Sequence, residues 1–308
     1  MVGPTAVGKT RLSIPLARRL DAEIVSVDSR QVYRGMDVGT AKPGPEERAA
    51  VPHHGLDRVD PGEAYSAGRF AREAREWIAG IRGRDRLPLL VGGTGFFLRA
   101  LLDPIVAEPG TDEGRRTRLR FHLRRHGRAE LERWVRALDP ERADVAAEGG
   151  PQRLERTLEV ALLTGRPLSW WHRHGAPEAP GIPGRVVVLH RPREELDRRI
   201  DERVDRMLAD GLVEEVRSLL AAGYPPEAPG MSATGYREVA AHLRGDRSLT
   251  DAADAIKRAS RRYARRQLTW FRNQLPGETR WVDARGPVEE RVEELAAIWL
   301  ATRDEDTG

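Results

Sequence analysis

The sequence predicts an α/β protein with a parallel-sheet core that carries a phosphate-binding loop, an inserted helical domain and a helical C-terminal part. Three observations lead to this prediction. Residues 3–10 read GPTAVGKT, the G-x-x-x-x-G-K-[ST] pattern of a phosphate-binding loop, or P-loop. Apolar runs at 23–28 and 87–95 end in an acid and in a glycine turn, as parallel strands do at a ligand-binding edge. Residues 111–175 show helical periodicity with little strand.

The P-loop is expected to bind a phosphate through converging backbone N–H groups, with Lys9 reaching the outer phosphate and the Thr10 hydroxyl facing Mg²⁺. Pro15 lies within the helix that follows and should kink it. The predicted phosphate-binding residues are Gly3, Pro4, Thr5, Ala6, Val7, Gly8, Lys9 and Thr10, and Thr10 is the predicted metal ligand.

The strand that normally leads into a P-loop is missing, because Met1 and Val2 alone cannot form it. We therefore expect the natural protein to start upstream of Met1, with about five to seven apolar residues leading into Val2.

The remaining elements give a P-loop NTPase-like core divided by a helical insertion. Asp28 and Thr94 follow the two early strands and should lie near the P-loop. The core is predicted over 1–110 and 185–308, and the insertion over 111–184, ending in the linker GAPEAPGIPG. Helices are expected at 129–140, 151–167, 193–210, 212–222 and about 250–273, and a return strand at 185–190; the rest of the C-terminal part is read as helical.

Composition limits the possible classes of protein. The chain has 308 residues, 39% hydrophobic and 32% charged, with no apolar run long enough to span a bilayer and no leader before the loop, so we expect a cytoplasmic protein without a membrane partner. We also expect a monomer. The absence of cysteine excludes disulfides and thiolate metal sites. Only three of the 52 basic residues are lysine, and this excess of arginine suits a nucleic-acid partner, although a general compositional bias would explain it equally well.

Four motifs beyond the P-loop indicate a family. They are VDSRQVYRGMDVGTAKP at 27–43, VGGTGFFLRAL at 91–101, SATGYREV at 232–239 and RRYARRQLTWFR at 261–272. Together, in this order and over nearly the whole chain, they resemble the tRNA dimethylallyltransferases. The resemblance implies transfer of a prenyl group from dimethylallyl diphosphate to N6 of the adenosine 3′ of the anticodon in tRNA. It also implies that the P-loop holds the prenyl diphosphate.

This chemistry needs a base near the weakly nucleophilic N6 amine, and cations or N–H groups on the departing diphosphate. The resemblance assigns Asp28 as the base; the alternative is a magnesium ligand. Thr94 resembles a residue that contacts the target nucleotide, with a helix cap as the alternative. The resemblance also implies that an arginine of the R-I-x-x-R stretch reaches the diphosphate; we favour Arg203 over Arg199, and a solvated charged face is the competing explanation. The predicted catalytic residues are Asp28, Thr94 and Arg203.

A tRNA-binding face is predicted on the long helix near 250–273. A stripe of residues at steps of three or four lies apart from Ile256 and Tyr263 and suits a phosphate backbone, although a solvated face would show the same pattern. This stripe comprises Arg258, Arg262, Arg265, Thr269 and Arg272. The full set of predicted tRNA-binding residues, which rests largely on the resemblance, is Asp28, Ser29, Arg30, Gln31, Thr94, Arg116, Gln152, Arg153, Leu154, Glu155, Arg156, Gly235, Tyr236, Arg237, Arg265, Arg266, Gln267, Thr269, Trp270 and Arg272.

One loop departs from the family pattern. AEGGPQR at 147–153 stands where relatives usually carry Asn-Asp before P-Q-R, which leaves the conformation of this loop open.

Other functions remain compatible with parts of the sequence. A small-molecule P-loop kinase would explain the loop and Asp28, but not the insertion or RRYARRQLTWFR. A prenyltransferase acting on free adenine nucleotides would have less need of an RNA-binding insertion, and a non-catalytic RNA-binding protein would not need Asp28.

Overall fold

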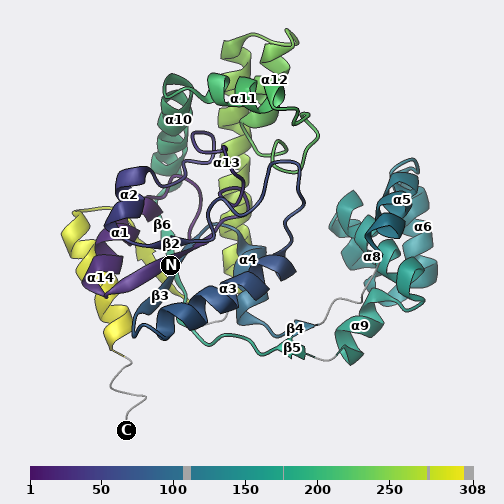
Figure 1. Cartoon of the computed structure of the whole chain (residues 1–308), viewed down its shortest axis with the longest axis horizontal. Helices are drawn as coiled ribbons and strands as arrows, with labels where there is room; N and C mark the ends of the chain where they lie inside the picture. The colour runs from purple at the N-terminus through teal and green to yellow at the C-terminus, as the bar shows by residue number, and fades with distance from the viewer. Residues whose placement is uncertain (107–111, 176, 276–277, 302–308) are drawn as a thin grey trace. The chain divides into compact units, whose positions relative to one another are not determined.

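The computed structural model describes residues 1–106, 112–175, 177–275 and 278–301. It divides into two compact units, Met1–Leu102 with Ile182–Gly308, and Asp103–Gly181 (Figure 1). The boundary expected between 110 and 111 lies outside the described residues.

The larger unit is built on a parallel sheet. Its strands are β1 (Ala22–Val27), β2 (His53–His54), β3 (Leu87–Gly92), β6 (Val187–His190) and β7 (Arg280–Asp283). The pairing order is β2-β1-β3 and β6-β7, and Val2 joins the two groups through parallel bridges to Gly92 and Val188. Val2 therefore occupies the position of a central strand between β3 and β6.

Helices accompany this sheet (Figure 1). They are α1 (Lys9–Arg19), α2 (Pro45–Ala50), α3 (Ala67–Arg82), α4 (Gly95–Leu102), α10 (Arg193–Ala209), α11 (Leu212–Ala221), α12 (Tyr236–Leu243), α13 (Leu249–Gln274) and α14 (Val288–Leu300). The helix α1 continues through Pro15 to Arg19, so the proline does not end it.

The main core cluster lies where α1, α10 and α14 meet the sheet. Leu16 of α1, Ile24 of β1, Leu89 of β3, Ile200 of α10 and Leu295 of α14 are all buried in it. Every residue of β1 is buried, as expected for a parallel strand covered on both faces. This packing fixes the carboxyl ends of β1 and β3, and with them the residues that follow these strands.

The smaller unit is helical. It contains β4 (Ile105–Val106), α5 (Glu113–Leu123), α6 (Arg128–Leu138), a 3₁₀ turn (Pro140–Arg142), α7 (Ala143–Glu148), α8 (Pro151–Thr164), α9 (Leu168–His174) and β5 (Pro177–Ala179). Its own core forms around Leu131, Val135, Leu154 and Leu158 from α6 and α8. The helix α8 ends at Gly165, which adopts a left-handed φ of 68°.

The predicted fold class, a mixed α/β chain with a parallel sheet and many helices, is confirmed. One expectation for the C-terminal part is wrong, since Arg280–Asp283 forms the edge strand β7 where only helices were expected. The antiparallel pair of β4 and β5 was also not foreseen; β5 lies within the segment read as a linker.

Candidate active site

The P-loop connects Val2 to α1 and adopts a conformation suited to anion binding. Ala6 and Gly8 have positive φ angles of 61° and 111°, and left-handed residues at successive turns are typical of the backbone concavities that bind anions. Gly3 has no room for a side chain, because a Cβ there would lie 2.8 Å from the carbonyl oxygen of Leu189. The loop is therefore held against β6 before the helix begins at Lys9.

Lys9 lies inside this loop. Its ammonium group donates to the carbonyl oxygens of Gly3 and Pro4, both at 2.9 Å. Burial lowers the pKa of Lys9 to about 8; the negative charge of Asp28 opposes this shift, and the positive charge of Arg203 adds to it. Asp28 and Arg203 therefore both lie close enough to Lys9 to act on its charge.

Three arginines from the β6–α10 region surround the loop. Arg191 donates to Val7 O at 2.9 Å, and Arg199 donates to Ala6 O at 2.9 Å. Arg203, one turn further along α10, donates to Thr40 O at 3.3 Å, and its burial lowers its pKa. Arg199 thus supports the loop backbone, whereas Arg203 shares the electrostatic environment of Lys9 and Asp28. The preference for Arg203 as the diphosphate ligand stays a prediction.

Asp28 directly follows β1, at the same edge of the sheet as the P-loop. One of its carboxylate oxygens accepts the Arg30 N–H at 2.8 Å, and the residue is only partly buried. Thr94, after β3, accepts the Ser29 N–H at 3.0 Å and donates to the Ser29 hydroxyl at 3.3 Å. Both hydrogen bonds of the Thr94 hydroxyl are therefore made with Ser29, in the segment that follows β1.

Tyr263 of α13 is a residue that the sequence analysis did not select. Its pKa is raised to about 12, first by burial and then by the negative charge of Asp28. Tyr263 therefore remains protonated at neutral pH. Tyr263, Gln267 and Trp270 are spaced by four and three residues, so they lie on one helix face. This spacing is the signal in the sequence that could have identified Tyr263 as a residue of the site.

Gln267 links the P-loop to the turn after β3. Its side-chain oxygen accepts the Thr5 N–H at 2.9 Å, and its amide nitrogen donates to Gly93 O at 2.8 Å. The side chain is buried, and a Cβ on Gly93 would lie 2.5 Å from its nitrogen. Gln267 therefore positions both phosphate-facing segments and does not present itself to a large partner, although it was predicted to bind tRNA.

We expect Gln267→Leu to weaken the binding of inorganic diphosphate by about tenfold, equivalent to ~1.4 kcal/mol. Leucine nearly conserves the volume but leaves the Thr5 N–H and the Gly93 carbonyl unpaired, which should also lower the free energy of unfolding by about 1–3 kcal/mol. Calorimetric titration and thermal unfolding measure the two effects. Gln274→Leu is the matched control, because Gln274 lies at the exposed end of the same helix and its side-chain oxygen accepts a hydrogen bond from Arg99. Equal diphosphate affinity in both variants would contradict the positioning role.

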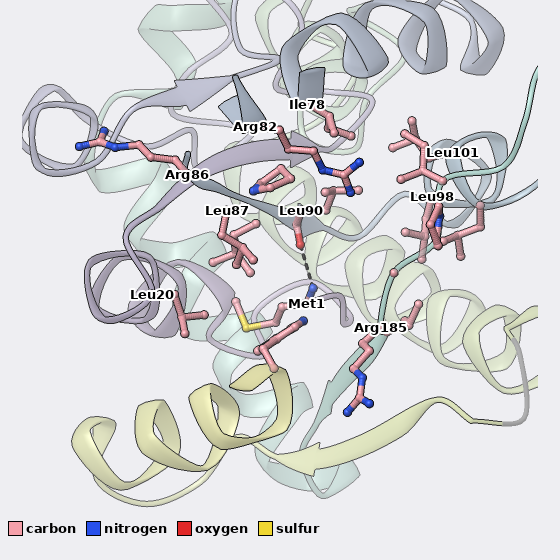
Figure 2. Close-up of a pocket in the computed structure, with 18 of the residues that line it drawn as sticks. Met1, Leu20, Ile78, Arg82, Arg86, Leu87, Leu90, Leu98, Leu101 and Arg185 are labelled. Atoms are coloured by element: carbon pink, nitrogen blue, oxygen red, sulfur yellow. Dashed lines mark hydrogen bonds between the residues drawn. The ribbon is translucent and has the colours of Figure 1, made fainter. Parts of the chain in front are cut away.

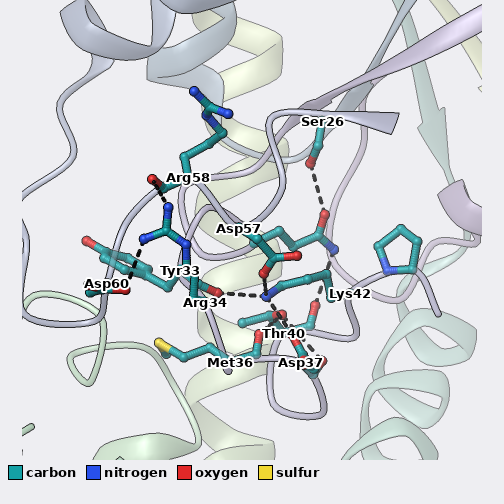
Figure 3. A network of polar contacts seen from close by, with 12 residues as sticks. Ser26, Tyr33, Arg34, Met36, Asp37, Thr40, Lys42, Asp57, Arg58 and Asp60 are labelled. Carbon is teal, nitrogen blue, oxygen red and sulfur yellow. Dashed lines mark hydrogen bonds and ion pairs between the residues drawn. The ribbon is translucent and has the colours of Figure 1, made fainter. Parts of the chain in front are cut away.

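The loop that follows Asp28 is organised around Lys42 (Figure 3). The Lys42 ammonium group is fully buried and contacts Asp37 and Asp57, both at 2.6 Å, and the Tyr33 carbonyl at 2.7 Å. Burial by itself raises the pKa of the Asp57 carboxyl, but hydrogen bonds from Lys42 and Arg48 outweigh this effect and lower the pKa. This network keeps the loop folded beside the site.

Gln31 and Arg30 brace the same loop. Gln31 accepts the Ser26 hydroxyl at 2.9 Å and donates to Ala41 O at 3.2 Å. Arg30 donates to Pro229 O and to the Ser232 hydroxyl, each at 3.1 Å. Both side chains were predicted to bind tRNA, and in this structure each has intramolecular partners.

Glu215 of α11 clamps the tip of the loop. Its carboxylate accepts the N–H groups of Asp37, Val38 and Gly39 at 2.7–3.1 Å, and the Tyr236 hydroxyl at 2.6 Å. Tyr236 is fully buried, and a Cβ on Gly39 would lie 2.6 Å from its ring. Direct tRNA contact by the Tyr236 side chain does not fit this burial; Tyr236 instead holds the loop against α12. Gly235, at a φ of 103°, directly precedes that helix, and Arg237 is exposed.

The residues of the site do not form a ready metal centre by themselves. Across residues 1–106, 112–175, 177–275 and 278–301, no group of three or more His, Cys, Asp or Glu side chains is arranged to hold a metal ion. A divalent cation here would depend on oxygens of a bound diphosphate, together with the Thr10 hydroxyl and at most a nearby carboxylate such as Asp28. Magnesium is commonly bound in this way. The donor set therefore fits Mg²⁺ only with a phosphate ligand present.

Comparison with known proteins identifies the family. A family model described as IPP transferase matches residues 31–274, and one described as isopentenyl transferase matches residues 1–57. The chain belongs to the tRNA dimethylallyltransferase family. A tRNA dimethylallyltransferase from Syntrophobacter fumaroxidans is 47% identical, with 92% of this chain and 82% of the relative covered. One from Geobacter metallireducens is 48% identical, with 92% and 91% covered.

Solved structures agree with this assignment. The full-length tRNA isopentenylpyrophosphate transferase from Bacillus halodurans has a TM-score of 0.72 and 37% identity, covering 99% of this chain and 96% of that one. A eukaryotic dimethylallyltransferase, described as acting on tRNA, has a TM-score of 0.83 and 26% identity, covering 99% and 78%. The fold is thus shared with members of the family over nearly the full chain.

In this member of the dimethylallyltransferase family, the predicted stripe on α13 is exposed. Arg258, Arg262, Arg265, Thr269 and Arg272 are all exposed, whereas Ile256 is buried and Tyr263 partly so. Arg265 contacts Asp197 at 3.0 Å, Arg266 lies over the Tyr263 ring and Arg272 over Trp281. Trp270 is half-buried and packs against Gly95 and the exposed Phe96.

The helical unit contains an arginine cluster around a buried acid. Arg116, Arg120 and Arg156 all contact Glu159, whose side chain is 1% exposed. Arg116 and Arg156, both predicted to bind tRNA, thus have a carboxylate partner within the unit. Leu154 is fully buried in the core of this unit, so its side chain does not fit the predicted tRNA contact; Gln152 is exposed, and Glu155 and Arg153 are partly exposed.

The unusual Gly149-Gly150 sequence has a clear conformational basis. A Cβ on Gly149 would lie 2.3 Å from Cδ of Arg153, so the Arg153 side chain occupies the space over that glycine and donates to Val145 O. Gly150 has a φ of 80°, a value that favours glycine, directly before α8. The two glycines therefore let the chain turn tightly from α7 into α8.

Within the described ranges, which omit 107–111, 176, 276–277 and 302–308, no helix is both long and apolar enough to cross a membrane.

Proposed function

We propose that this chain transfers the dimethylallyl group of dimethylallyl diphosphate to N6 of the adenosine 3′ of the anticodon in tRNA. One observation carries the proposal: the Asp28 carboxylate lies within electrostatic reach of Lys9 and Arg203 at the edge of the sheet that carries the P-loop. A base and an anion-binding site are thereby combined in one place. Family membership supports the substrates.

The reaction requires both groups at once. The bond between the allylic carbon and the diphosphate oxygen breaks, a bond forms between that carbon and N6, and the N6 proton moves to the Asp28 carboxylate. The backbone N–H groups of Ala6 to Thr10, the Lys9 ammonium and the Arg203 guanidinium would stabilise the charge on the departing diphosphate. Asp28 is the carboxylate that acts on the charge of both Lys9 and Arg203.

Thr94 and Tyr263 would position the nucleotide. Both lie beside Asp28, and Thr94 is fixed by its bonds to Ser29. The adenine has to leave its stack in the anticodon loop to bring N6 to this site, as base-modifying enzymes generally require. The half-buried Trp270 and the exposed Phe96 offer ring faces nearby in α13 and α4 for a neighbouring base.

Mg²⁺ would be held by Thr10 and the diphosphate. When bound, it would neutralise charge on the diphosphate and make it a better leaving group. The Arg258–Arg272 face of α13 and the exposed residues at the start of α8 would contact the tRNA backbone. We also propose a monomeric protein that works in the cytoplasm, where its tRNA substrate is found.

Label transfer separates this function from its alternatives. The chain should move labelled prenyl from dimethylallyl diphosphate to tRNA, and should move neither prenyl to AMP nor phosphoryl from ATP to either acceptor. Prenyl transfer to AMP alone would favour a prenyltransferase for free nucleotides. Phosphoryl transfer from ATP would favour a kinase.

The exposed arginines of α13 should act on tRNA binding and not on prenyl diphosphate binding. Replacing Arg262 and Arg265 with glutamine should weaken tRNA binding and flatten its salt dependence, by roughly 0.9 of a unit of slope per lost phosphate contact on duplex-like RNA and less on single strands. Filter binding over a range of salt concentrations measures this slope. The matched control replaces Arg244 and Arg285, two exposed arginines outside α13, with glutamine. If both double variants bind tRNA like the parent, the stripe on α13 is solvated surface.

A further inference from the structure

The loop of residues 29–42, which follows Asp28, lies at the edge of the sheet that carries the P-loop. The cavity of about 650 Å³ in Figure 2 lies at the opposite edge. Leu20 and Asp21, just ahead of β1, line this cavity together with Leu87 at the start of the parallel strand β3. Open α/β sheets bind their ligands at the carboxyl ends of the strands. The loop, and not this cavity, is therefore placed to shape the site.

The carbonyl oxygen of Thr40 joins this loop to α10. It accepts a hydrogen bond from the Arg203 guanidinium at 3.3 Å and one from the Gln31 side chain at 3.4 Å. Gln31 in turn accepts the Ser26 hydroxyl at 2.9 Å, in the strand that ends one residue before Asp28. A planar guanidinium that is anchored at one nitrogen has its remaining N–H groups directed as a rigid fork. The position of Thr40 O therefore contributes to the direction of the Arg203 guanidinium.

The turn of residues 36–42 connects the tip of the loop to Thr40. The buried Thr40 side chain donates to Met36 O at 2.6 Å. The Lys42 N–H donates to Asp37 O at 3.0 Å, and the Lys42 ammonium contacts the Asp37 carboxylate at 2.6 Å. Figure 3 shows Met36, Asp37, Thr40 and Lys42 together in this turn. Because these bonds close the turn on itself, a displacement of its tip also moves Thr40 O.

Glu215 of α11 holds the tip of this turn. Its Oε2 accepts the N–H groups of Asp37 and Val38 at 2.8 and 2.7 Å. Its Oε1 accepts the Gly39 N–H at 3.1 Å and the Tyr236 hydroxyl at 2.6 Å. Burial and then the charge of Glu215 raise the pKa of Tyr236, so this hydroxyl keeps its proton. Three successive N–H groups around one carboxylate form a backbone concavity of the kind that binds anions. Here the anion is a side chain of the same protein.

We propose that Glu215 is a positioning residue for Arg203, acting through the turn of residues 36–42 and the Thr40 carbonyl oxygen. Glu215 binds the three N–H groups at the tip and thereby fixes Thr40 O, and Thr40 O orients the guanidinium toward the diphosphate. This inference rests on the proposed function, in which Arg203 binds the departing diphosphate. Glu215 therefore affects diphosphate binding only while Arg203 is present.

The test is a double-mutant cycle in the full 308-residue chain, with inorganic diphosphate and Mg²⁺ as the ligand. Glu215→Gln removes the carboxylate charge with little change in size, and Arg203→Gln removes the guanidinium. Calorimetric titration gives the diphosphate affinity of the parent, the two single variants and the double variant, and thermal unfolding is followed in each. Glu214→Gln is the matched control, because Glu214 is exposed on the same helix and accepts a hydrogen bond from Arg217.

We expect Glu215→Gln to weaken diphosphate binding by about tenfold. The sign is informative, since loss of a negative charge by itself would strengthen the binding of an anion. Glu214→Gln, which removes the same charge one residue away, should bind diphosphate at least as tightly as the parent. Adding Glu215→Gln to Arg203→Gln should cause no further loss, because the positioned group is already absent. A purely structural role would instead lower the stability in both backgrounds and give fold-changes that multiply.

Tyr236→Phe tests the same path with a smaller change in packing. It removes one hydrogen-bond partner of Glu215 but keeps the ring that packs against Gly39. It should weaken diphosphate binding by about threefold in the parent and leave it unchanged in Arg203→Gln. Parental affinity in both Glu215→Gln and Tyr236→Phe would overturn the proposal, as would fold-changes that multiply with Arg203→Gln. If Arg203→Gln alone binds diphosphate like the parent, the role of Arg203 in the proposed function fails, and this inference fails with it.

Discussion

Replacing Asp28 with asparagine should slow prenyl transfer by about 10²- to 10⁴-fold while leaving tRNA binding nearly unchanged. Asparagine keeps the size of the side chain and an oxygen for the Arg30 N–H, a bond that Asp28 makes at 2.8 Å. It lacks the negative charge that accepts the N6 proton. Single-turnover transfer at saturating substrates measures the effect, because it isolates the chemical step from binding and release.

The same variant distinguishes the two roles considered for Asp28. If this carboxylate mainly bound Mg²⁺, the defect would be in diphosphate affinity and would shrink as Mg²⁺ is raised. Asp254→Asn is the matched control, since Asp254 is exposed on α13. A parental rate constant in Asp28→Asn would remove this residue from the mechanism, and rescue by Mg²⁺ would reassign it as a metal ligand.

Replacing Lys9 with methionine should lower the single-turnover rate by about 10²- to 10³-fold, the usual cost of removing one charged donor from a developing anion. Methionine fills much of the same space, and the contacts of Lys9 to Gly3 O and Pro4 O show that its ammonium is already directed into the loop. Lys257→Met is the control, because Lys257 pairs with Asp205 on α10, away from the loop. Equal rates in the two variants would mean that Lys9 does not act on the diphosphate.

The pH dependence of diphosphate binding should carry the signature of Lys9. Burial holds its pKa at about 8 in the free protein, so the ammonium loses its proton above this pH. Binding of an anion requires the charged form, and affinity should therefore fall above pH 8 by up to about tenfold per pH unit. Calorimetric titration from pH 6 to pH 10 should show this fall in the parent and not in Lys9→Met. An identical pH profile in both proteins would contradict the assignment.

Local patterns in the sequence predicted the main elements well. The GPTAVGKT loop, the apolar runs that became β1, β3 and β6, and the stepwise leucines of α8 each define their element within a few neighbouring residues. The position of Asp28 at the end of β1 followed from the same logic, because polar residues at the carboxyl ends of parallel strands meet at one edge. The exposed stripe on α13 also follows directly from helical periodicity.

The parts that were not foreseen depend on contacts between distant residues. The strand β7 spans only Arg280–Asp283. It forms because it pairs with β6, which lies about ninety residues earlier in the sequence. Tyr236 and Gln267 belong to motifs that suggested RNA contact. In the structure, Tyr236 donates to Glu215 and Gln267 donates to Gly93 O, and both side chains are buried. These partners lie elsewhere in the sequence, so the motifs alone do not reveal them. The parallel bridges of Val2 to Gly92 and Val188 likewise depend on β3 and β6, which lie far from Val2 in the sequence.

The central claim, that the adenosine 3′ of the anticodon receives the prenyl group, is tested most directly by locating the modification. A tRNA carrying that adenosine and a tRNA in which guanosine replaces it are incubated with the chain and dimethylallyl diphosphate, then digested and analysed by mass spectrometry. We predict one added five-carbon unit on the fragment that contains the adenosine, and none on the guanosine tRNA. Prenylation of the guanosine tRNA, or of a different fragment, would contradict the claim.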